Sequence, residues 1–251
     1  MSITPPGYAR LVSARARGVV LESCRSALET ILANETIYDF AARQPEARKF
    51  RGRATVYAFQ LPDGSADAVV RRSMRGGALS GLNTDLFLLP TRGLRELIAS
   101  LRLRSADVPT PEVIAFITYP AGPFFRRGDV ITREIEGADL ASILVPGSSE
   151  EGRRGALEAT AATIASLARI GAHHPDLNLR NILVGESNDA PLAWVLDVDR
   201  IRFHVPGDPM VLRANIDRLE GSLRKRRDLG EIAIGDAEMA ALRARVMELA
   251  Q

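Results

Sequence analysis

The segment GAHHPDLNLRNILV, residues 171–184, places imidazoles, a carboxylate and an amide directly before an aliphatic run. Asp176 and Asn181 lie five positions apart, and Asp197 follows sixteen positions later, at the end of the apolar run AWVL. Carboxylate and amide oxygens are the ligands that Mg²⁺ prefers, and such sites leave coordination positions for water and phosphate oxygens. The spacing therefore predicts an oxygen-donor site for magnesium that holds the phosphate of a substrate.

Two simpler explanations compete with this interpretation. Loop Asp and Asn residues often only cap turns. In addition, the adjacent His173 and His174 beside an aspartate could belong to a metal-dependent phosphohydrolase. The chain has only three histidines, of which the third is His204, and histidine-based metal centres generally need more ligands. The two carboxylates and the amide, taken together with the apolar runs that flank them, favour the magnesium site.

The order of these residues follows a known pattern. His174-Pro175-Asp176, then Asn181, then Asp197-Val198-Asp199 matches the protein-kinase series H-x-D-x-x-x-x-N followed by D-x-G, with aspartate in place of the glycine. The segments HPDLNLRNIL, LDVDR and VVRRSMRGGALSG together resemble the bacterial lipopolysaccharide kinases. Within that family, the most similar group phosphorylates 3-deoxy-D-manno-octulosonic acid (Kdo). The resemblance covers roughly residues 50–227.

This resemblance implies a role for each residue of the set. Asp176 would accept the proton of the attacking sugar hydroxyl, or orient that hydroxyl, as the general base. Asn181 and Asp197 would hold Mg²⁺ against the phosphates of ATP. His174 would be structural, with its ring bridging the catalytic loop and the D-V-D turn.

The earlier half of the chain would bind the nucleotide. By resemblance, Arg71 stands where protein kinases carry lysine, and it would contact phosphate and pair with Glu96. Gly52 and Arg53, in RGRATVY, occupy the place of the glycine-rich phosphate loop. Gly76-Gly77 would form a second loop beside phosphate or substrate. A plain turn remains the alternative for both loops.

The elements that must position these residues follow from periodicity and turn signals. We expect strands and one helix first, then mostly helices, as an α+β protein of two lobes with a protein-kinase-like fold. The small β-rich lobe would span 1–136, the helical catalytic lobe 137–251, and residues up to about 33 match no part of the family. The expected helices are 23–34, 92–104, 138–144 and 151–170, with further helices after Val211 that are separated by the basic segment RKRR. The expected strands are 54–61 paired with 68–72, then 108–119, 128–137, 181–185 and, after a polar loop at 186–191, 192–203.

Composition bounds the remaining choices. The formal charge of +2 is too small to indicate a nucleic-acid partner, and the single cysteine, Cys24, excludes a disulfide framework and suits the cytoplasm. We see neither a signal peptide nor an apolar run of the ~18 residues that a membrane span needs. Lys49 and Lys225 are the only lysines among 33 basic residues, so arginine, which binds phosphate through a planar fork, carries nearly all the positive charge.

The implied partners are ATP, Mg²⁺ and a sugar acceptor that is either lipid-linked or small. A Kdo–lipid A acceptor would carry phosphates and carboxylates, which suits three groups of arginines near the site or on a solvated face: Arg71, Arg72 and Arg75, then Arg126-Arg127, then Arg224 to Arg227. The resemblance also implies peripheral contact with the cytoplasmic face of the inner membrane. Two alternatives stay open, namely a kinase of another hydroxylated acceptor such as a heptose or an aminoglycoside, and a pseudokinase that binds nucleotide without catalysis.

Overall fold

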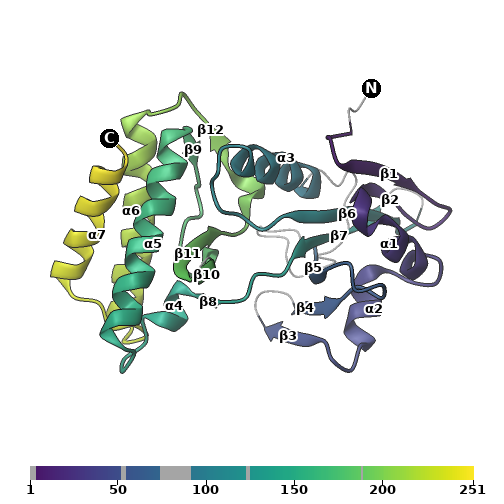
Figure 1. The fold of residues 1–251 in the computed structure, drawn as a ribbon, viewed down its shortest axis with the longest axis horizontal. Coiled ribbons are helices and arrows are strands. Elements are labelled where there is room, and N and C mark those ends of the chain that lie inside the picture. Colours follow the sequence, from purple (N-terminus) through teal and green to yellow (C-terminus); the bar gives the residue numbers. More distant parts are fainter. Residues whose placement is uncertain (1–3, 52–54, 74–91, 123–124, 188) are drawn as a thin grey trace. The chain divides into compact units, whose positions relative to one another are not determined.

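The structure is a computed structural model that describes residues 4–51, 55–73, 92–122, 125–187 and 189–251. The chain divides into two compact units (Figure 1). Unit 1 comprises Met1–Ile98 and Glu112–Glu134, and unit 2 comprises Ala99–Pro111 and Ile135–Gln251. The mixed α+β class is confirmed, while the lobe boundary at residue 136 stays a prediction.

Unit 1 is built on a seven-stranded sheet in the order β1-β2-β6-β7-β5-β4-β3, in which every neighbouring pair is antiparallel. The strands are β1 (Tyr8–Val12), β2 (Arg17–Leu21), β3 (Arg48–Arg51), β4 (Thr55–Gln60), β5 (Asp67–Arg72), β6 (Val113–Pro120) and β7 (Arg126–Arg133). The predicted hairpin is confirmed, because β4 pairs with β5 through Val56↔Arg71 to Gln60↔Asp67 around an Asp-Gly turn. Strand β3 was not predicted.

The first residues of the chain, which had no predicted role, complete this sheet. Strands β1 and β2 form a hairpin that joins the sheet along β6. They are followed by the 3₁₀ turn η1 (Glu22–Cys24), by α1 (Arg25–Leu32), which confirms the predicted helix, and by α2 (Ile37–Arg43), which was not predicted. Leu28 and Ile37 of these helices are fully buried against one face of the sheet, together with Ile117. The N-terminal segment is thus part of the unit 1 core.

Helix α3 (Arg92–Arg104) matches its predicted bounds, and its first part packs on the other face of the sheet. Successive side chains of a strand point to opposite faces. Ala115 and Ile117 of β6 therefore join α1 and α2, whereas Phe116 lies against Gly93 of α3. A Cβ atom at Gly93 would collide with the Phe116 ring, so glycine permits the close approach of α3.

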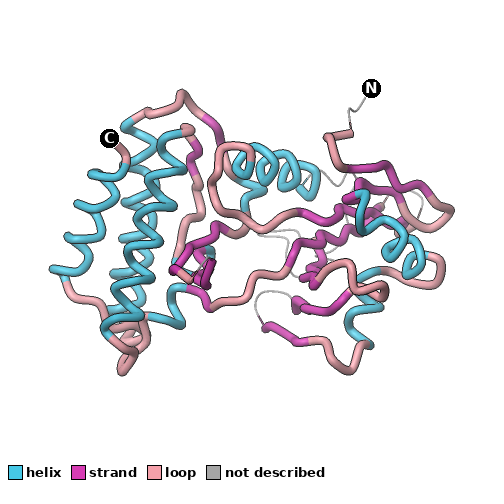
Figure 2. Tube along the Cα trace, viewed as in Figure 1, coloured by secondary structure: helices cyan, strands magenta, loops and turns pink. Residues whose placement is uncertain are grey.

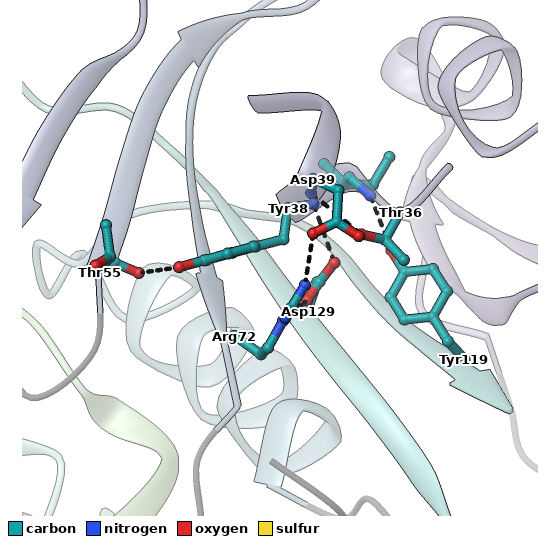
Figure 3. Close-up of polar contacts among 8 residues, drawn as sticks. Thr36, Tyr38, Asp39, Thr55, Arg72, Tyr119 and Asp129 are labelled. Atoms are coloured by element: carbon teal, nitrogen blue, oxygen red, sulfur yellow. Dashed lines mark hydrogen bonds and ion pairs between the residues drawn. The ribbon is translucent and has the colours of Figure 1, made fainter. Parts of the chain in front are cut away.

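A buried polar cluster ties α2 to the sheet (Figure 3). Asp129 of β7 is 1 % exposed and accepts a hydrogen bond from the backbone N–H of Tyr38 at 3.2 Å. Among the described residues its Oδ1 has no hydrogen-bond partner, and the Nε of Arg72 lies 3.9 Å away. Arg72 also stacks on the Tyr38 ring and donates to Asp39 at 3.0 Å. The hydroxyl of Tyr119 accepts from the N–H of Ile37 at 3.1 Å, which completes the attachment of the helix.

Unit 2 consists mainly of helices, as predicted (Figure 2). Its helices are α4 (Leu140–Ile143), α5 (Glu150–Arg169), α6 (Pro209–Asp228) and α7 (Asp236–Leu249), with 3₁₀ turns η2 (Leu179–Asn181) and η3 (Val198–Arg200). Its strands are β8 (Ala138–Asp139), β9 (Ala172–His173), β10 (Ile182–Ser187), β11 (Ala190–Val195) and β12 (Arg202–Phe203). Helices α5, α6 and α7 pack together around residues such as Ile164, Ile216 and Leu242. Strand β10 pairs with β8 and β11, and β9 pairs with β12.

Three local predictions for unit 2 were wrong. The run 192–203 is not one strand, because Asp197 takes a left-handed conformation that ends β11 and starts η3. The polar loop expected at 186–191 is largely strand, since the pairing of β10 with β11 extends to Ser187↔Ala190. The RKRR segment does not separate two helices but forms the last turns of α6. Cations are favoured there by the helix dipole.

Candidate active site

The predicted catalytic loop runs from β9 to η2 and begins where α5 stops. Gly171 has φ +69°, and a Cβ atom there would lie 2.5 Å from the carbonyl oxygen of His204. Only glycine combines this left-handed turn with such a close approach. Pairing of β9 with β12 then directs the chain into His174 and Asp176.

His174 connects the loop to the D-V-D turn, as the resemblance implied. Its side chain is fully buried. Its Nδ1 accepts a hydrogen bond from the N–H of Asp176 at 3.3 Å, so Nε2 carries the proton and donates to the carbonyl oxygen of Leu196 at 3.0 Å. Burial lowers the pKa of His174, which favours the neutral ring that this pair of bonds requires. The residue is a structural bridge.

Asp176 has its backbone held and its carboxylate accessible. Its carbonyl oxygen accepts 2.9 Å hydrogen bonds from the side-chain amides of Asn178 and Asn181. Its side chain is 43 % exposed and accepts a 2.8 Å hydrogen bond from Arg218 of α6. A carboxylate in a fixed loop that solvent and substrate can reach is suited to accept a proton from a hydroxyl.

Asn181 and Asp197 come from segments that are hydrogen-bonded to each other. The N–H of Leu196 donates to the carbonyl oxygen of Asn181 at 2.9 Å. The side-chain nitrogen of Asn181 is engaged by Asp176, which leaves its side-chain oxygen as the atom to bind a cation. Asp197 has φ 54° and ψ 45°, a conformation that non-glycine residues adopt at a cost and that is often found at functional sites. This donor set fits Mg²⁺, which is bound by few protein oxygens and keeps waters or phosphate oxygens.

Two residues of α6 that the sequence analysis did not single out hold the loop. Asn215 is fully buried; its Oδ1 accepts from the N–H of His174 and its Nδ2 donates to the carbonyl oxygen of Ala172, both at 2.9 Å. Arg218 follows one turn later and donates to Asp176 and to the carbonyl oxygen of Pro175. Their spacing of three positions puts both side chains on one face of α6. The available signal was Asn215, a polar residue among the apolar Val211, Ile216 and Leu219.

The predicted pair of Arg71 and Glu96 forms within unit 1 (Figure 1 shows β5 and α3). Strand alternation explains the choice of partners. Val70 and Arg72 face α1 and α2, whereas Arg71 faces the side on which Glu96 of α3 is 5 % exposed. Glu96 is therefore a buried residue of α3 and not an ordinary solvent-exposed helix residue. The phosphate contact of Arg71 stays a prediction.

The other predicted sites have different outcomes. Gly52, Arg53 and Gly76-Gly77 lie outside the described residues. Three of the grouped arginines have acidic partners, since Arg224 pairs with Glu220 at 2.6 Å, Arg227 with Asp236 at 2.5 Å, and Arg226 with Glu231. These pairs neutralise the cluster that was considered for acceptor phosphates.

The histidines do not assemble a metal centre in the described part of the chain, where no group of three or more His, Cys, Asp or Glu side chains could hold an ion. His173 and His204 instead lie with their rings 5.9 Å apart. Burial and the nearby His204 lower the pKa of His173.

Comparison with known proteins agrees with this geometry. Residues 42–245 match the model of the lipopolysaccharide kinase (Kdo/WaaP) family. The chain belongs to this family. As a lipopolysaccharide kinase it is an enzyme that uses ATP, and the recognition of the family from the catalytic-loop motifs is confirmed.

Several curated relatives of this lipopolysaccharide kinase bear the name 3-deoxy-D-manno-octulosonic acid kinase. The protein of Vibrio vulnificus (strain YJ016) is 31 % identical over 198 residues, which cover 76 % of this chain and 78 % of the relative. The protein of Xanthomonas oryzae pv. oryzae (strain PXO99A) is 30 % identical, with 70 % and 68 % covered.

A solved structure, WaaP in complex with acyl carrier protein, has a TM-score of 0.53 and 16 % identity, and covers 89 % of this chain and 85 % of that one. The expected kinase-like fold is thereby confirmed. In the described parts of the lipopolysaccharide kinase, no helix has both the length and the apolar character of a membrane span.

Proposed function

We propose that this lipopolysaccharide kinase transfers the γ-phosphoryl group of ATP to a hydroxyl of Kdo in a lipid A precursor. The observation that carries the proposal is the assembly of Asp176, Asn181 and Asp197 in one hydrogen-bonded loop system of unit 2. The names of the relatives support Kdo as the acceptor.

Phosphoryl transfer is catalysed mainly by positioning and by charge stabilisation. Asp176 receives the proton of the sugar hydroxyl as that oxygen attacks the γ-phosphorus, while His174 and Asn215 keep the loop in place. Asn181 and Asp197 would hold Mg²⁺, which supplies charge neutralisation for the phosphates when it is bound. In unit 1, Arg71 would contact phosphate with its orientation set by Glu96, and Gly52 and Arg53 would contribute to the same nucleotide site.

A lipid-linked acceptor would require peripheral contact with the inner membrane, from the cytoplasm. One end of unit 2 supports such contact, because Val205, in the turn between β12 and α6, and Met210, in the first turn of α6, are 73 % and 67 % exposed. Apolar side chains beside exposed Arg202 and Arg213 suit an anionic lipid surface. Sedimentation with vesicles that contain anionic phospholipid should be reduced by the double change Val205→Ser and Met210→Ser; unchanged sedimentation would contradict this contact.

The deciding experiment measures transfer of labelled phosphate from ATP to a Kdo–lipid A precursor with magnesium, for the wild type and Asp176→Ala. We expect label in the lipid from the wild type only. Label that persists in Asp176→Ala would overturn the role of Asp176. Transfer by the wild type to a heptose or an aminoglycoside, but not to Kdo, would show that the enzyme acts on that acceptor and not on Kdo. ATP binding without transfer to any acceptor would identify a pseudokinase.

A further inference from the structure

Arg218 is bound by the catalytic loop through only one edge of its guanidinium group. Its Nε donates to the carbonyl oxygen of Pro175 at 3.1 Å, and its Nη2 donates to the Oδ1 of Asp176 at 2.8 Å. These two atoms form the side edge of the fork. Within the described residues no other acceptor is bound, and 48 % of the side chain is exposed. The end edge, made of Nη1 and Nη2, therefore offers donors to a ligand beside Asp176.

The loop is also held by hydrogen bonds that do not involve Arg218. The N–H of Asp176 is bound by His174, its carbonyl oxygen by Asn178 and Asn181, and the N–H of His174 by Asn215. A guanidinium group at this place is better explained by a second anion that it binds during the reaction.

We propose that Arg218 binds an anionic group of the acceptor, specifically the carboxylate of an acidic sugar, and holds the attacking hydroxyl next to Asp176. This inference rests on the proposed function and identifies the feature that would select the acceptor. The planar fork of arginine matches a carboxylate through two parallel hydrogen bonds, which a lysine ammonium group does not reproduce. The hydrogen bond from Nε to the carbonyl oxygen of Pro175 fixes the plane of the guanidinium group. This bond can persist when a ligand binds, because its acceptor belongs to the backbone of the loop.

The test assays two enzymes, each with two acceptors. Wild type and Arg218→Met are assayed with a Kdo–lipid A precursor and with the same precursor in which the Kdo carboxylate is converted to its methylamide. We expect Arg218→Met to raise the KM for the acidic acceptor about tenfold or more, which is the effect of one charge-assisted hydrogen bond. The KM for ATP should be unchanged, and the acidic acceptor and its methylamide should have nearly equal KM values in Arg218→Met, so that the preference for the acid disappears.

Arg218→Lys keeps the charge without the fork, and we expect it to restore only part of the preference. Arg224→Met is the matched control, because Arg224 lies on the same helix in an ion pair with Glu220, which Arg243 also binds. It should leave both KM values unchanged. If Arg218→Met does not fold, the inference is tested by comparing the KM values of Arg218→Lys and the wild type for the two acceptors.

The outcomes separate this inference from the proposed function. An equal fall in kcat with both acceptors would make Arg218 a positioning residue for Asp176 and overturn the inference. Failure of the wild type to phosphorylate either acceptor would instead overturn the proposed function, whatever the variants do.

Discussion

Two pairs of arginine and aspartate, one in each unit, show how burial separates the roles of the same chemical groups. In unit 1, Asp129 is 1 % exposed, and burial raises its pKa to about 6 despite Arg72 at 3.9 Å (Figure 3). In unit 2, Asp176 and Arg218 are 43 % and 48 % exposed and joined at 2.8 Å. The first carboxylate costs free energy when it is charged and serves to anchor α2. The second stays hydrated and accessible, as a general base must.

The largest expected effect tests the exposed pair. Asp176→Asn should lower kcat by about a thousandfold, because a positioned general base contributes on the order of 10²–10⁴ in rate. The free energy of unfolding should change by less than about 1 kcal/mol, since the ion pair is exposed. Phosphate transfer and urea unfolding measure the two quantities. The comparison would fail if Asp129→Asn, which should keep its kcat, lost activity to the same extent.

The second prediction concerns a partly buried pair, Arg71 and Glu96, that lies on the other face of the same sheet. Arg71→Met should destabilise unit 1 by about 3 kcal/mol, because Glu96 would keep a buried charge without its guanidinium partner. Urea unfolding checks the value. The double variant Arg71→Met with Glu96→Gln should recover a large part of the loss. Equal destabilisation by the single and double variants would show that the pair itself is not responsible.

The third prediction uses the raised pKa of Asp129. The folded protein holds a proton on this carboxyl up to pH about 6, whereas the unfolded chain releases it near 3.8. The contribution of Asp129 to stability therefore falls as pH rises from about 4 to about 6, by up to about 3 kcal/mol.

Asp129→Asn removes this titration, so the stability of the wild type relative to the variant should decrease over that pH range. Urea unfolding of both proteins at several pH values measures the difference. Asp63→Asn is the control, because Asp63 lies in the exposed turn of the β4–β5 hairpin and its pKa is lowered by hydrogen bonds from Ser65. A difference between wild type and Asp129→Asn that does not vary with pH would contradict the assignment.

The smallest effect is expected for a partly exposed pair remote in sequence from the loop. Arg226→Ala removes the ion pair with Glu231 and should cost less than about 1 kcal/mol. Transfer to the lipid-linked acceptor should be unchanged, because position beside the catalytic loop, and not exposure alone, gives the Asp176 pair its role. A clear rise in the KM of Arg226→Ala for the acceptor would instead indicate that the RKRR segment binds the acceptor.

Short-range patterns with a clear turn or helix signal gave accurate predictions. The β4–β5 hairpin follows from two strand-forming runs around Asp-Gly, and α3 follows from the helical spacing of Leu94, Leu97, Ile98 and Leu101. The strands β1 and β2 were missed because each has only five residues with weak alternation. They are strands because β6 supplies an edge to pair with, which local propensity does not reveal.

The amino-acid sequence by itself determined the family and the order of Asp176, Asn181 and Asp197, because these residues lie within 22 positions and their spacing reflects one loop and one turn. Only the tertiary structure decided which groups surround them. Arg218 is 42 positions from Asp176, and Asn215 is 41 positions from His174. Asp129 is 91 positions from Tyr38. Contacts of such separation depend on how whole helices and strands pack, and no local pattern in the chain encodes that packing directly.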